Sequence, residues 1–90
     1  MSDIPFTGFV ISLASTAAIH FGDIPDPMSG EKAEVNLEAA AHMIGILGLL
    51  EEKTRGNLTA EERQVLEQVL YELRMRFVEV SGEKKLIIEP

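Results

Sequence analysis

Two prolines only two positions apart, Pro25 and Pro27, divide the N-terminal half of the chain into two segments. A proline lacks an amide donor and restricts the residue before it, so a single helix cannot run through this point. Gly22 stands just ahead of the pair and favours the end of a helix. Because apolar residues recur before it at three- and four-residue steps, we expect a first helix over about residues 5–21.

Start signals of two kinds predict two further helices. Asn36 is a good N-cap residue, and with Gly56 as a stop it predicts a second helix over about residues 36–54. The sequence TAEE from Thr59 to Glu62 is a capping box, in which the threonine hydroxyl caps the glutamate amide and the glutamate carboxylate reaches back. We therefore expect a third helix over about residues 60–80.

The third helix carries the clearest apolar stripe. Its members recur at helical spacing and are Leu66, Val69, Leu70, Leu73, Phe77 and Val80. Glu72 and Arg76 stand four positions apart and are expected to form a supporting ion pair. Gly82 is expected to end the helix, which leaves residues 83–90 as a flexible or partner-ordered tail.

These patterns predict an all-α fold in which residues 1–82 form one domain of three antiparallel helices. A chain of 90 residues buries only about 60–65% of the surface that its unfolded form exposes. Residues 39–50, AAAHMIGILGLL, carry no charge on any side of the second helix, and a helix that is apolar all round is normally buried on all sides. Because two neighbouring helices cannot surround it, we expect homo-oligomerisation, most simply a two-fold dimer, to complete the fold.

The expected contact between copies uses residues from all three helices. Small residues recur every four positions on the first two helices, which allows backbones to approach closely. A second, smaller apolar stripe lies on the third helix, away from its main stripe. The candidate interface residues are Phe6, Phe9, Leu13, Thr16, Ala41, Gly45, Leu47, Tyr71, Met75 and Val78.

Composition excludes several classes of function. The chain has no cysteine, hence no disulfide, thiol nucleophile or sulfur-based zinc site, and we expect a cytoplasmic location. A net charge of -7 repels phosphate, so nucleic acid is not an expected partner. The uncharged stretch over residues 4–22 has no preceding cation and is diluted by polar residues. Neither a signal peptide nor a membrane span is therefore expected.

Several motifs together resemble one small bacterial family. From Gly22 the chain reads GDIPDPMSGEKAEVNLEAAAHMIGILGLLEEKTRGNLTAEERQVLEQVLYELRMRFVEV. Its acidic Pro-Asp-Pro turn followed by GE, its VNLE helix start and its LLEEKTRGNLT junction resemble the family catalogued as domain of unknown function eighteen forty-four. The family has no assigned activity, so the resemblance implies a bacterial cytoplasmic helical protein and nothing about catalysis.

We find no residues arranged for catalysis or for a cofactor. His20, followed by Asp23 and Asp26, matches no standard metal-ligand spacing, and aspartates beside prolines are ordinary turn residues. His42 lies inside an apolar run, where we expect a packed residue rather than a catalyst. The sequence contains neither a nucleophile elbow nor a phosphate-binding glycine loop. We therefore expect no enzymatic activity, no metal and no cofactor.

The loop from Gly22 to Glu34 is long for a connection between helices. A hinge explains its prolines but not its length, so contact with another protein through this loop stays open. The favoured hypothesis is a non-enzymatic homo-oligomer that serves as a structural or regulatory interaction module. The alternative is a peripheral membrane or hydrophobic-ligand-binding protein whose apolar first helix meets lipid, although the net negative charge disfavours it.

Overall fold

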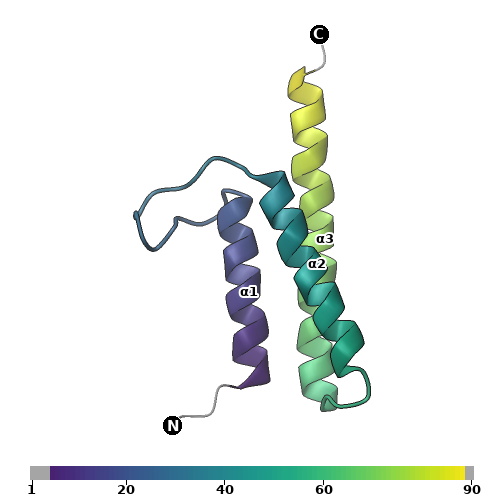
Figure 1. The fold of residues 1–90 in the computed structure, drawn as a ribbon. Coiled ribbons are helices and arrows are strands. Elements are labelled where there is room, and N and C mark those ends of the chain that lie inside the picture. Colours follow the sequence, from purple (N-terminus) through teal and green to yellow (C-terminus); the bar gives the residue numbers. More distant parts are fainter. Residues whose placement is uncertain (1–4, 89–90) are drawn as a thin grey trace.

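The computed structural model describes residues 5–88, with side chains described for residues 5–82, and consists of three helices. These are α1 (Phe6–His20), α2 (Leu37–Thr54) and α3 (Ala60–Ile88), and no strand occurs over the described range. Figure 1 shows α1 and α3 running in one direction and α2 in the opposite direction. Each helix contacts both others. The predictions of an all-α fold and of three helices packed together are confirmed.

The core lies where the three helices meet. Among the residues with described side chains, ten apolar ones are buried, and they come from the three helices and from the position directly after α1. They are Val10, Ala17, Phe21, Ala40, Met43, Leu47, Leu66, Leu70, Leu73 and Val80. Val69 and Phe77, the other members of the predicted α3 stripe, pack against this core at its edge. The helical periodicity of α3 therefore predicted its buried face correctly.

The predicted start signals of α2 and α3 are present as hydrogen bonds. The Asn36 side chain accepts a bond of 3.0 Å from the amide of Ala39. The Thr59 hydroxyl accepts one of 3.1 Å from the Glu62 amide, and the Glu62 carboxylate accepts one of 2.9 Å from the Thr59 amide. Both helices thus begin with their first free amides partly satisfied, as the local sequence predicted.

The third helix is longer than its sequence suggested. We expected it to end near residue 80 with Gly82 as the stop, but α3 continues to Ile88 and extends beyond the ends of α1 and α2 (Figure 1). A glycine inside a helix costs only about 1 kcal/mol relative to alanine. Residues 83–86 are Glu-Lys-Lys-Leu, all good helix formers. The two final positions of the predicted tail, 89 and 90, lie outside the described residues.

Candidate functional site

The surface of α2 and α3 that faces away from the core carries exposed apolar and small side chains. We call it the outer face and define it by Ala41, Gly45, Tyr71, Met75 and Val78. All five residues are exposed, and Tyr71 and Val78 each keep 64% of their accessible surface. The three α3 members are four and three positions apart, so they form one stripe along the helix. The α3 part of the outer face is therefore a strip rather than scattered residues.

An open groove of about 300 Å³ runs between α2 and α3 along this face. Its lining residues are Ala41, Ile44, Arg74, Phe77 and Val78. Four of these five side chains are apolar, and the guanidinium of Arg74 is the charged group among them. The groove thus joins the α2 part of the outer face to the α3 part.

Small residues on α2 leave the helix backbone accessible beside this groove. A Cβ added to Gly45 would meet nothing within 4 Å, apart from the helix's own backbone. At Gly48 an added Cβ would lie 3.7 Å from Nη2 of Arg74, so the guanidinium rests against α2 at this point. Another helix could approach α2 closely at Gly45 without displacing a side chain of this chain.

Half of the predicted interface residues form the outer face, and the other half lie elsewhere in the structure. Leu47 is fully buried in the core of the single chain, so its placement in the interface is not supported by the structure. Phe6 and Leu13 are partly buried and pack against the same core. Thr16 is also partly buried, and its hydroxyl donates a bond of 3.2 Å to the carbonyl of Ser12. Phe9 is exposed on α1, outside the outer face defined above.

Two neighbouring helices do not surround α2, as its uncharged residues 39–50 led us to expect. Its buried residues, Ala40, Met43 and Leu47, face α1 and α3. Leu49 keeps 55% of its surface exposed, and Ala41 and Gly45 are exposed as well. One side of α2 is therefore left open in the single chain.

The loop of residues 21–36 is closed at its base by backbone hydrogen bonds. Gly22 has a φ of 79°, a value that favours glycine. Its amide donates a hydrogen bond of 3.0 Å to the carbonyl of Ile19. The amide of Asp23 donates a hydrogen bond of 2.9 Å to the carbonyl of Ala18. Together the two hydrogen bonds form the pattern that is typical of a helix ended by glycine. The amide of Asn36 donates a hydrogen bond of 2.8 Å to the carbonyl of His20, so the two ends of the loop lie side by side.

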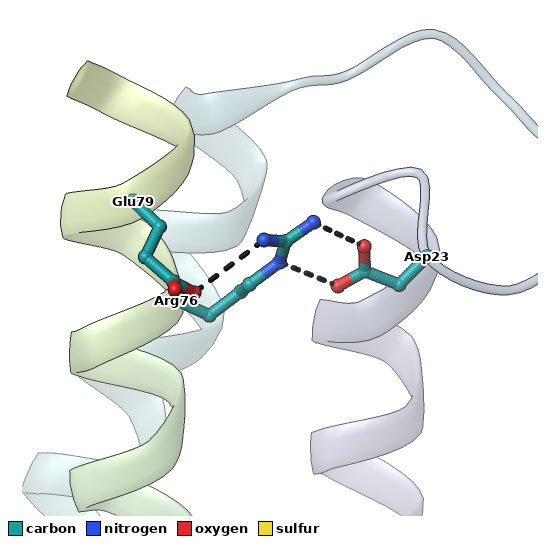
Figure 2. Close-up of polar contacts among 3 residues, drawn as sticks. All are labelled: Asp23, Arg76 and Glu79. Atoms are coloured by element: carbon teal, nitrogen blue, oxygen red, sulfur yellow. Dashed lines mark hydrogen bonds and ion pairs between the residues drawn. The ribbon is translucent and has the colours of Figure 1, made fainter. Parts of the chain in front are cut away.

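An ion pair ties the same base to α3, as Figure 2 shows. Nε and Nη2 of Arg76 donate to the two carboxylate oxygens of Asp23 at 2.9 and 2.6 Å. Nη1 also lies 3.4 Å from Oε1 of Glu79. The hydrogen bonds that Arg76 donates to Asp23 are the main cause that raises the pKa of Arg76, and the guanidinium therefore stays charged at every accessible pH.

This ion pair replaces the one that the sequence predicted. We expected Arg76 to pair with Glu72, but the Glu72 carboxylate instead accepts a bond of 2.9 Å from the Gln68 side-chain amide. Asp23 offers both carboxylate oxygens to the fork of the guanidinium, and such a bidentate pair is stronger than a single hydrogen bond. No local signal marks a contact between residues 53 positions apart.

The outer part of the loop is ordered by Asp26 and presents Met28. The Asp26 carboxylate accepts a hydrogen bond of 2.8 Å from the Met28 amide. The Asp26 carbonyl accepts one of 2.7 Å from the Gly30 amide. Met28 keeps 93% of its surface exposed. Figure 1 shows the loop projecting to the side of the three helices. Such closed surface loops frequently carry function.

The two histidines lie apart from any cluster of metal-ligating side chains. His42 is exposed on α2, and His20 is partly buried at the end of α1. Among the described residues, no group of three or more His, Cys, Asp or Glu side chains could hold a metal ion. Over the same residues, no helix has the length and apolar character needed to cross a membrane.

Comparison with known protein families gives a match. The model of a family described as Domain of unknown function (DUF1844) matches residues 3–79. No curated protein and no solved structure matches the chain.

Proposed function

The chain belongs to the DUF1844 family, whose description assigns no activity, and from this starting point we propose that it is a non-enzymatic, homo-oligomeric interaction module. Copies of the chain associate through the outer face of α2 and α3, most simply as a two-fold dimer. The assembled protein then acts as a structural or regulatory component rather than as a catalyst.

The observation that carries this proposal is the exposed apolar stripe of α3. Single exposed apolar side chains are normal on a protein surface. Here Tyr71, Met75 and Val78 align on one stripe and adjoin an apolar groove, and aligned patches of this kind are typical of protein contacts. Tyrosine and methionine are also enriched at such contacts. The arrangement favours a protein partner over bare solvent.

The size of the core supports association of identical copies. Among the described residues, ten apolar side chains are buried, whereas nine large apolar side chains are exposed. A small domain buries a limited fraction of its surface, and association adds burial without lengthening the chain. A second copy supplies apolar surface that the single chain lacks.

The polar groups of the chain support a role without catalysis. Asp23 and Arg76 tie the loop to α3, and Asn36, Thr59 and Glu62 cap helices. Each of these side chains therefore has a structural role in the fold. The best-ordered polar contacts of the described chain thus stabilise the fold.

The lipid-binding alternative requires α1 to leave the helical body. The α1 segment contributes Val10 and Ala17 to the core, with Phe21 directly after it, and the Asp23–Arg76 pair holds its C-terminal end. Releasing α1 would expose all three apolar residues and break the pair. We therefore place the functional surface on α2 and α3 rather than on a detached α1.

The loop of residues 21–36 offers a second contact, with a different protein. Met28 is nearly fully exposed on a loop whose base is held by hydrogen bonds and by Arg76. A flexible apolar side chain on a preorganised loop suits insertion into an apolar pocket, because little ordering remains to be done on binding. This contact would leave the outer face free for self-association.

The first experiment is absolute mass by light scattering on a sizing column, over a wide range of concentrations. We expect a stable multiple of 9.9 kDa. The variant Tyr71→Glu places a charge on the outer face and should lower the mass toward that of one chain. Met28→Glu makes the same type of change on the loop and should leave the mass unaltered. A measured mass equal to that of one chain at all concentrations would refute self-association.

A further inference from the structure

The outer stripe of α3 carries a charge pattern that defines an orientation. Glu67, Tyr71, Arg74 and Val78 are all exposed and follow one another at steps of four, three and four residues. This spacing places them along one face of the helix. Glu67 and Arg74 lie seven residues apart, and Tyr71 stands near the midpoint between them. The stripe therefore has an acid on one side of a tyrosine and a base on the other.

Both charges of this stripe are unused within the described part of the chain. The ion pairs formed there join Arg76 to Asp23 and to Glu79, and neither Glu67 nor Arg74 takes part in one. Arg74 lies against Gly48 at the edge of the apolar groove. A charged group beside an apolar groove gains from a carboxylate brought to it by a partner.

The pattern distinguishes the two ways in which identical helices can pack. In a parallel pair, Glu67 of one copy meets Glu67 of the other, and the two Arg74 side chains also meet. In an antiparallel pair with its two-fold axis near Tyr71, each Glu67 lies opposite Arg74 of the second copy. Like charges that face each other disfavour the parallel arrangement, and opposite charges favour the antiparallel one.

We propose that two copies of this chain form a two-fold dimer in which their α3 helices pack antiparallel across Tyr71, with Glu67 of each copy paired with Arg74 of the other. This orientation rests on the self-association proposed above and adds its geometry. A two-fold contact is isologous, so one surface must be its own complement. The sequence from Glu67 to Arg74 meets that condition.

The charge of the whole chain is a further argument for this patch. With a net charge of -7, two copies repel each other over most of their surfaces. Glu67 and Arg74 sum to zero, so the patch around Tyr71 is a place where two acidic molecules can approach without that cost. The exposed ring of Tyr71 then loses its water at the centre of the contact, where aromatic side chains contribute most.

A charge exchange tests the orientation. Glu67→Arg and Arg74→Glu, made singly, each convert two opposite-charge pairs of the dimer into like-charge pairs. We expect each to raise the dissociation constant by about tenfold or more. The double variant Glu67→Arg/Arg74→Glu exchanges the charges and should return it to within about threefold of the unmodified value. Masses over a dilution series give these constants, and circular dichroism confirms that the helices are retained.

Two loop variants serve as matched controls. Glu34→Arg changes the net charge as Glu67→Arg does, and Lys32→Glu changes it as Arg74→Glu does. Both controls lie away from α3 on exposed loop positions and should leave the dissociation constant within about threefold of the unmodified value. Single α3 variants that behave like these controls, or a double variant as weak as the singles, would overturn the antiparallel pairing while self-association stands.

Cross-linking gives a second readout, because the chain has no cysteine of its own. Tyr71→Cys places two thiols near the axis, and a short bismaleimide should join two copies. Val78→Cys places the thiols about 20 Å apart along the antiparallel helices and should not be joined. Equal cross-linking of both variants indicates a parallel pair and would overturn the orientation. An unmodified protein that is a monomer at every concentration would overturn both the orientation and the proposed self-association.

Discussion

Two leucines on the same helix, Leu47 and Leu49, should differ strongly in how much stability the same substitution removes. Leu47 is fully buried between the helices, and Leu49 keeps 55% of its surface exposed. Replacing either by alanine removes the same three carbon atoms and leaves helix propensity almost unchanged. Any difference in the free energy of unfolding therefore reports burial alone.

The magnitude for Leu47→Ala follows from the transfer of the lost carbons and from the cavity that remains. Buried leucine-to-alanine changes cost about 2.7–5 kcal/mol. A chain of this length has a total stability of about 5–13 kcal/mol. A loss of about 3 kcal/mol corresponds to a fall in Tm of about 12–24 °C. Leu49→Ala should lie within about 0.5 kcal/mol of the unmodified chain.

The assay is guanidinium unfolding followed by the helical signal in circular dichroism. Protein concentration is kept as low as the signal allows, because association through the outer face adds a concentration-dependent contribution to stability. The reasoning would be refuted by equal losses in the two variants at low concentration. It would also be refuted by a larger loss for Leu49→Ala, since that outcome would place Leu49 and not Leu47 in the core.

Three further predictions concern the loop and its base. Asp23→Asn removes one partner of the Arg76 pair, whose side chains are each about a third exposed. We expect the free energy of unfolding in denaturant to fall by about 0.5–1 kcal/mol. The same loss in 1 M salt would argue against an electrostatic origin. Gly22→Ala should lose about 1–2 kcal/mol because φ is 79°, although an added Cβ meets nothing closer than 3.4 Å; an unchanged Tm would contradict the strained backbone. Dilute peroxide should oxidise Met28 well before the buried Met43, as peptide mass spectrometry can follow, and equal rates would contradict the placement of these side chains.

Local signals predicted the helices because the groups that make them are neighbours in the chain. The Asn36 cap and the Thr59–Glu62 capping box each satisfy amides within three residues, so no distant part of the molecule is needed. The periodic stripe of α3 likewise predicted which of its faces is buried. A weak stop such as Gly82 was less informative, because good helix formers after it carry α3 onward.

The outer face could be predicted only in part. Tyr71, Met75 and Val78 stood out because they form a second stripe opposite the main one, and all three are exposed. Leu47, another candidate for the interface, is buried in the core of the single chain, and residues 39–50 around it carry no charge on any side of α2. With no polar face to orient such a helix, its sequence does not say which side turns inward.

Contacts between distant segments depended on the tertiary structure alone. The sequence by itself determined three helices, their starts and the buried side of α3, since those features follow from spacing and from neighbouring hydrogen bonds. Only the packed structure decided that Arg76 holds Asp23, that residues 21–36 close on themselves, and that α2 turns Leu47 inward and leaves Gly45 open. These outcomes depend on how three helices fit against one another, and that fit is a property of the whole chain rather than of any one segment.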